Sequence, residues 1–145
     1  MPRPNGYLLD SNIVIALVRN NDLGKFLDRT YQLTSGSFAF YTSVVVLGET
    51  TALAVKLGWN AAKQGTLSTI LGLFTTLDIF DTDVIQAYAE IDAYSDGNGI
   101  KMGKNDLWIA ATAKKNDLTL LTTDKDFDHL HPKYIDLTWV DPTSK

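Results

Sequence analysis

The sequence predicts an α/β protein in which helices cover both faces of a central parallel sheet of four to five strands, giving three layers. Short apolar runs alternate along the chain with longer segments whose apolar residues recur at helical spacing. The length of 145 residues and the mass of 16.0 kDa fit one domain. We therefore expect a single domain over residues 1–145, with its core from about residue 7 to residue 136.

The first half of the chain is expected to contain two strands and four helices. The strands are the apolar run Tyr7–Leu9 and the aromatic-rich run Phe38–Tyr41. The helices are Ile13–Val18 after a Ser11 or Asn12 cap, Asp22–Leu33, Val44–Leu57 after a Thr42 or Ser43 cap, and Asn60–Thr75. Three consecutive valines open the third helix and locally favour a strand, but its later residues recur at helical spacing, so we interpret it as a helix.

The second half continues the alternation. Strands are expected at Leu77–Phe80, Leu118–Leu121 and either Tyr134–Leu137 or Leu137–Val140. Helices are expected at Asp81–Ser95 with Asp81 or Thr82 as cap, Asn105–Lys115, and a short one at Asp124–Leu130. The glycine-rich stretch Asp96–Lys104 is expected to be a mobile loop.

Composition excludes several classes of function. The chain has no cysteine, so it forms no disulfide scaffold, no thiolate metal site and no cysteine nucleophile. Its net charge of −4 and pI of about 5.0 argue against a protein that coats nucleic acid by bulk charge. No stretch is long and apolar enough for a membrane span, and the first residues lack a signal-peptide pattern. We expect a cytoplasmic protein with no membrane partner.

The acidic residues are unevenly distributed in type and in place. Fifteen of the seventeen are aspartates, which favour caps and turns over helix interiors. Asp10 ends the first strand, Asp124 follows the strand Leu118–Leu121, Asp106 lies in the first turn of a helix, and Glu49 lies in the second turn of the helix after the second strand. Because sites of parallel sheets form beyond the carboxyl ends of the strands, these four acids are candidates for one cluster.

Two interpretations of these acids stand side by side. Each aspartate taken alone is suited to cap a helix and to complement its dipole. Four carboxylates brought together would instead repel one another and need protons or cations to neutralise them. Hard oxygen ligands suit Mg²⁺ or Mn²⁺, and such a site suits phosphoryl chemistry. Their joint position at predicted element ends favours the metal interpretation.

Four segments in order carry a resemblance to a known family. They are Leu8-Leu-Asp10-Ser-Asn12-Ile-Val-Ile15, Ser43-Val-Val-Val-Leu-Gly-Glu49, Asn105-Asp106-Leu-Trp-Ile-Ala-Ala111 and Leu121-Thr-Thr-Asp124-Lys-Asp126-Phe127. Together they resemble the PIN-domain family, above all its VapC-type members, the toxins of type II toxin–antitoxin pairs. The similarity runs from about Tyr7 to Asp136 and implies a PIN-like α/β/α fold.

The resemblance also implies an activity and a set of residue roles. It implies an endoribonuclease that uses one or two Mg²⁺ or Mn²⁺ ions and leaves 5′-phosphate and 3′-hydroxyl ends. Catalytic and metal-binding roles are carried over to Asp10, Glu49, Asp106 and Asp124, with Asp126 as an accessory ligand or a helix acid. Supporting roles that orient these acids are carried over to Asn12, Ser43 and Thr122.

The same resemblance implies partners. They are an RNA substrate, with transfer RNA one option, a cognate small antitoxin and a second copy of the chain in a homodimer. The antitoxin is expected to lie near the helices of Asp22–Leu33 and Ala61–Phe74 and to place a basic residue in the acidic pocket.

Basic and aromatic residues give a weaker indication of how RNA would bind. Residues 101–115 contain four lysines and one aspartate, and Lys101 and Lys104 flank the predicted site, where they are candidates for phosphate contacts. We interpret the three tryptophans as core or partner-contact residues and not as a stacking platform for RNA.

Other functions remain open at this stage. A PIN-type nuclease that processes cellular RNA without an antitoxin would have the same acids, and so would a catalytically inactive PIN-like module that only binds a partner. An aspartate-dependent phosphatase is disfavoured, because its usual second aspartate after the first strand is replaced by Asn12.

Overall fold

The computed structural model describes residues 5–36 and 39–145. The strands are β1 (Tyr7–Leu9), β2 (Phe40–Ser43), β3 (Thr75–Leu77), β4 (Thr119–Thr122) and β5 (Asp136–Trp139). The α-helices are α1 (Ser11–Arg19), α2 (Asp22–Tyr31), α3 (Val44–Lys56), α4 (Ala61–Gly72), α5 (Thr82–Gly97) and α6 (Lys104–Asn116), and a 3₁₀ helix, η1, spans Lys125–Leu130.

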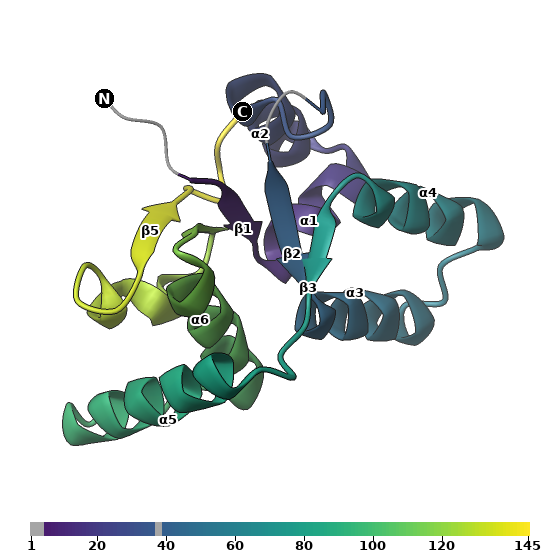
Figure 1. Cartoon of the computed structure of the whole chain (residues 1–145). Helices are drawn as coiled ribbons and strands as arrows, with labels where there is room; N and C mark the ends of the chain where they lie inside the picture. The colour runs from purple at the N-terminus through teal and green to yellow at the C-terminus, as the bar shows by residue number, and fades with distance from the viewer. Residues whose placement is uncertain (1–4, 37–38) are drawn as a thin grey trace.

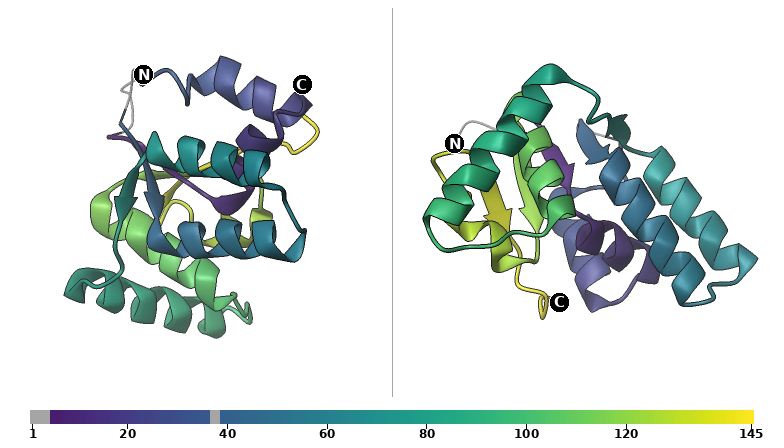
Figure 2. Two further views of the ribbon diagram at one scale, coloured as in Figure 1. Left: turned by 90° about the vertical axis from the view of Figure 1, so that its right-hand side faces the viewer. Right: turned by 90° about the horizontal axis from the view of Figure 1, so that it is seen from below.

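The five strands form one parallel sheet in the order β3-β2-β1-β4-β5. Helices α1 to α4 lie on one side of the sheet, and α5 and α6 lie on the other (Figures 1 and 2). The chain moves outward from β1 to β3 and then crosses to β4 on the opposite side of β1, so right-handed crossovers place the two sets of helices on opposite faces. The predicted three-layer α/β fold with a parallel sheet is confirmed.

The core lies where the central strands meet helices on both faces. Leu8, Leu9, Leu120 and Leu121 in β1 and β4 are fully buried, as expected for strands covered on both sides. Phe127 of η1 is also fully buried. This packing fixes the carboxyl ends of β1 and β4, from which the candidate site is built.

Two strand predictions are corrected. The second strand begins at Phe40 and continues to Ser43, later than expected, and Phe38 lies outside the described residues. The predicted helix to Thr75 ends instead at Gly72, and Thr75–Leu77 forms β3 beside β2. The strand expected at Leu77–Phe80 therefore begins two residues earlier and ends at Leu77. Its start was misplaced because Thr75 and Thr76 are exposed on this short edge strand, so no apolar alternation marks them.

The loop before the sixth helix is shorter than expected. Helix α5 continues through Gly97, and α6 already begins at Lys104. Helix α2 ends earlier than Leu33, because Gln32 adopts a left-handed conformation with φ of 57°. The predicted valine-rich third helix is confirmed. It forms despite its valines because the Ser43 side chain caps it and Val46 is buried in the core. Among the described residues, no helix has the length and apolarity needed to cross a membrane.

Candidate metal centre

The acidic residues gather at the carboxyl-terminal edge of the sheet. Asp10 directly follows β1 and is the N-cap of α1, and Asp124 follows β4 and is the N-cap of η1. Glu49 lies on α3, the helix after β2, and Asp106 lies in the first turn of α6. The two capping aspartates therefore have the structural role considered for them, and the same positions place them at the site.

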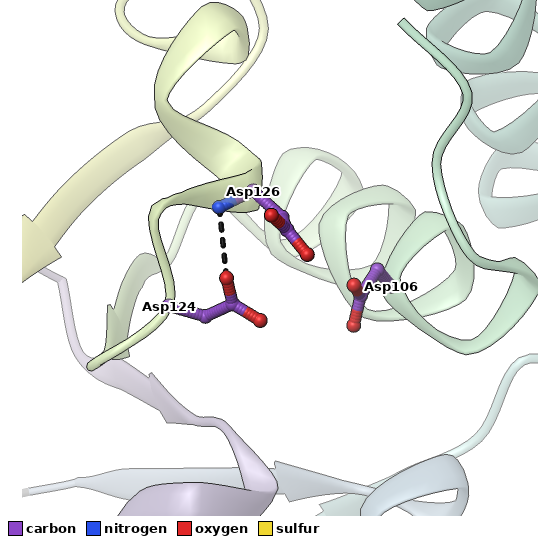
Figure 3. A group of neighbouring side chains, drawn as sticks. All are labelled: Asp106, Asp124 and Asp126. Carbon is purple, nitrogen blue, oxygen red and sulfur yellow. Dashed lines mark hydrogen bonds between the residues drawn. The ribbon is translucent and has the colours of Figure 1, made fainter.

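Three carboxylates approach one another most closely. Asp106, Asp124 and Asp126 each offer an oxygen that lies within 4.8 Å of the other two. Figure 3 shows the side chains of Asp124 and Asp126 directed toward Asp106 across the gap between η1 and α6. The Asp126 backbone N–H donates to Oδ1 of Asp124 at 2.9 Å and fixes these two acids relative to each other. Asp126, expected only as an accessory, is thus a member of the tight group.

Asp10 lies beside this group and is held by a hydrogen-bond network. Its Oδ1 accepts from the Ser11 backbone N–H at 2.8 Å, and its Oδ2 accepts from the Thr122 hydroxyl at 2.7 Å and from the Asn12 amide at 3.4 Å. The Thr122 oxygen accepts in turn from the backbone N–H of Asp124 at 3.0 Å. Asn12 and Thr122, expected to orient the acids, both contact Asp10.

Glu49 is positioned by two residues that sequence reasoning did not assign to the site. The Ser11 hydroxyl donates to its Oε1 at 2.7 Å, and the Asn105 amide donates to its Oε2 at 3.2 Å. Ser11 follows Asp10 and Asn105 precedes Asp106, so adjacency to the acids was the available signal. Ser43, expected among the supporting residues, accepts from the Val45 backbone N–H at 3.1 Å and so caps α3.

Burial and the neighbouring carboxylates raise the pKa values of two of the acids, Asp10 and Asp106. Burial is the main factor that raises the pKa of Asp10 to about 6, and the charges of Glu49 and Asp124 add to it, while the Thr122 hydrogen bond acts in the opposite direction. The pKa of Asp106 is raised to about 7, first by burial and then by the charges of Asp10, Asp124, Glu49 and Asp126. The two shifts connect all five acids electrostatically.

Asp106 differs from Asp10, Glu49 and Asp124 in its partners. No residue of the described ranges donates a hydrogen bond to its carboxylate, whereas Asp10, Glu49 and Asp124 each accept at least one. A half-buried carboxylate that faces other carboxylates and no donor is stabilised by a proton or a cation. The all-oxygen donor set fits a hard divalent ion such as Mg²⁺ or Mn²⁺.

Three hollows surround the cluster. The largest, of about 560 Å³, lies along α3 and is lined by residues that include Glu49, Asn105 and Trp108. A second, of about 390 Å³, includes Lys104 and Asp106, and a third, of about 320 Å³, includes Lys101 and Asp126. Lys101 and Lys104 thus line different hollows, each of which contains one acid of the tight group.

The chain matches the PIN domain family model over residues 7–131 and belongs to the PIN-domain family. The fold and the acidic site accordingly define a PIN-domain protein of the nuclease class. Solved structures of VapBC toxin–antitoxin systems have the same fold over nearly the whole chain. A comparison with curated proteins gave no significant match.

Three solved structures illustrate the similarity. VapBC2 from Rickettsia felis, solved with a fragment of its promoter DNA, is 23% identical with a TM-score of 0.79, over 94% of this chain and 99% of that one. FitAcB from Neisseria gonorrhoeae is 29% identical with a TM-score of 0.70, over 90% and 95%. Mycobacterium tuberculosis VapC20, a toxin that cleaves the sarcin–ricin loop, is 18% identical with a TM-score of 0.66, over 86% and 95%.

Proposed function

We propose that the protein is a metal-dependent endoribonuclease and the toxin of a type II toxin–antitoxin pair. The observation that carries the proposal is the position of Asp106, a half-buried carboxylate with a raised pKa that faces Asp124 and Asp126 and has no donor among the described residues. An arrangement of this kind is costly for stability, and a bound cation offsets the cost. Membership of the PIN-domain family supports the nuclease assignment.

The proposed roles follow from the geometry. Asp106, Asp124 and Asp126 would hold a Mg²⁺ or Mn²⁺ ion, and Asp10 and Glu49 would complete the site from the other side. The bound ion would supply Lewis-acid activation of the phosphodiester and of the attacking water. Asn12 and Thr122 hold Asp10 in place, and Ser11 and Asn105 hold Glu49. Attack by water in line with the 3′ oxygen would break the P–O3′ bond and leave 5′-phosphate and 3′-hydroxyl ends.

The proposal includes partners. The structural neighbours include toxin–antitoxin complexes, which supports a small cognate antitoxin that silences the nuclease and a homodimeric toxin acting in the cytoplasm. RNA is the proposed substrate. A PIN-type RNA-processing nuclease without an antitoxin is the alternative with the same chemistry.

The decisive test compares growth and RNA cleavage for the wild type and the variant Asp106→Asn. We expect growth arrest and divalent-ion-dependent cleavage of single-stranded RNA with the wild type, and neither with the variant at equal soluble level. Asp22→Asn removes one exposed carboxylate on α2 and is the matched control, expected to behave as wild type. Full cleavage by Asp106→Asn at saturating Mn²⁺ would reject the site. Cleavage without arrest would favour the nuclease that needs no antitoxin.

A further inference from the structure

Trp139 is an exposed aromatic side chain beside the acidic cluster. It is the last residue of β5, the edge strand next to β4, and 37% of its surface remains exposed. Its indole N–H donates to the backbone carbonyl of Thr123 at 2.9 Å. Thr123 immediately precedes Asp124, so this bond fixes the ring against the turn that presents one of the three clustered carboxylates.

A lysine lies over the same ring. The Lys125 Nζ is 4.6 Å from the centroid of the Trp139 ring, at a distance typical of a cation–π contact. Lys125 follows Asp124 directly, is exposed, and has no ion pair of 4.0 Å or less with a described residue. It also lines the hollow of about 320 Å³ that contains Lys101 and Asp126. The flexible Lys125 side chain can therefore leave the Trp139 ring and bind a phosphate next to the acidic cluster.

The other two tryptophans are engaged differently. Trp59 is 8% exposed and belongs to the core, and Trp108 packs against Tyr88 with ring centroids 4.2 Å apart. Trp139 is the tryptophan that combines exposure, a ring fixed by a hydrogen bond and a neighbouring cation. Aromatic rings next to cations are the usual elements of single-strand binding, because every base can stack on them and the cation holds the backbone.

We propose that Trp139 and Lys125 form a nucleotide-binding subsite in which Trp139 stacks on an unpaired base of the RNA and Lys125 binds the neighbouring phosphate. This inference rests on the proposed function, since it names how the substrate of that site is held. Trp139 contacts Thr123, which immediately precedes Asp124, so the stacked base would belong to a nucleotide close to the acidic cluster. It makes the protein selective for single-stranded or unstacked RNA, because a base inside a duplex has no free face for the indole.

The test measures coupling between Trp139 and one base. The probe is a short single-stranded oligoribonucleotide of mixed sequence, with an abasic nucleotide at each position in turn, bound to the full chain carrying Asp106→Asn so that it is not cut. We expect Trp139→Ala to weaken binding roughly 5- to 100-fold, as loss of one stacked base does, and Trp139→Phe to retain most of the affinity. One abasic position should weaken binding to the Trp139 protein and have no further effect on the Trp139→Ala protein.

Two further readouts separate stacking from a structural role. Binding should quench tryptophan fluorescence, and Trp139→Phe should abolish that quenching. Lys125→Ala should reduce the slope of log affinity against log salt by about 0.7, the value for one phosphate contact on a single strand, whereas Lys133→Ala should leave it unchanged. Trp139→Leu, with its melting temperature as a check on folding, replaces Trp139→Ala if the latter does not fold.

The outcomes also distinguish this inference from the proposed function. Equal losses at the abasic position with and without Trp139 would overturn the stacking subsite, even if the wild type cleaves RNA. Coupled losses together with no cleavage by the wild type would retain the subsite and overturn the nuclease.

Discussion

The Thr122 hydroxyl donates to Oδ2 of Asp10 at 2.7 Å, and its oxygen accepts from the backbone N–H of Asp124 at 3.0 Å. The buried Thr122 hydroxyl thus connects the end of β4 both to Asp10 and to the turn that carries Asp124. Asp10 and Thr122 are 112 residues apart in sequence, and the pairing of β1 with β4 brings them together.

Thr122→Val should impair catalysis with little change in fold. Valine has nearly the same shape, but it leaves Asp10 without its closest donor and the Asp124 N–H without an acceptor. Because the Thr122 hydrogen bond lowers the pKa of Asp10, its loss raises that pKa further. We expect a loss of about 10- to 100-fold in kcat/KM, as for other residues that orient metal ligands, and an acid limb of the pH–rate profile displaced to higher pH. Thr122→Ser should restore both, and failure of serine to do so would assign the effect to packing.

The metal-free protein should become less stable between pH 5 and pH 8. The pKa values of Asp10 and Asp106 are raised from 3.8 to about 6 and about 7, so the folded protein binds these protons more tightly than the unfolded chain. The stability from this source is fully present below about pH 3.8 and is lost as the pH rises through 6 and 7. Because solvent screens the charges around half-exposed Asp106, we expect a decrease on the order of only 2 kcal/mol, measured by urea unfolding in EDTA. Asp106→Asn should flatten this dependence and raise the stability at pH 8, and Asp22→Asn should not.

Divalent ions should reverse that loss. At pH 8, Mg²⁺ or Mn²⁺ at about 100 times its dissociation constant stabilises a folded protein by about 2.7 kcal/mol. We expect a rise in melting temperature on adding either ion to the wild type and little or none in Asp106→Asn. Asp136 is an exposed acid at the start of β5, so Asp136→Asn should retain the full rise and serves as the control. A wild-type melting temperature that does not change on adding either ion would contradict the proposed metal centre.

Local pattern was sufficient for the fold and for the placement of most acids. Buried strands and strong helices such as the one around Ile109 are predictable, because their apolar periodicity directly reflects burial. The edge strand Thr75–Leu77 was expected at Leu77–Phe80, because the two exposed threonines at its start do not differ in pattern from a helix end. What defines the site is long-range: the closeness of Asp106 and Asp126 depends on how α6 and η1 pack, which no local pattern encodes.

The surroundings of the acids show the same limit. The hydrogen bond from Ser11 to Glu49 joins residues from different elements and could be anticipated only from its position next to Asp10. The exposure of Trp139 was also beyond sequence reasoning, because a tryptophan at the end of a strand is equally compatible with burial.

Lys101 and Lys104 should contribute to RNA binding through charge. Each lines a hollow that also contains one clustered acid, so both can reach phosphates on either side of the scissile bond. Replacing both by alanine should weaken RNA binding and reduce its salt slope by about 0.7 for each phosphate that is no longer bound. The matched control is the double replacement of Lys114 and Lys115, which carries the same charge change on α6 but removes ion pairs with Glu90 and Asp81. Equal salt slopes for the two double variants would show that Lys101 and Lys104 act only through general surface charge and make no specific phosphate contact.

Only glycine fits at position 24, where α2 packs against α1. Gly65, on helix α4, has free space around it and serves as the control. A Cβ built at Gly24 would lie 2.1 Å from the backbone carbonyl oxygen of Ala16, so the two helices must separate to accept alanine. A Cβ at Gly65, within α4, meets no atom within 4 Å. We therefore expect Gly24→Ala to lower the free energy of unfolding by at least 1–3 kcal/mol, and Gly65→Ala to raise it by roughly 0.5–1 kcal/mol through helix propensity. Urea unfolding of both variants measures the difference. Because Asp10 is the N-cap of α1, Gly24→Ala should also reduce RNA cleavage, whereas Gly65→Ala should leave cleavage unchanged. A Gly24→Ala protein as stable as the wild type would show that the α1–α2 contact is not close-packed.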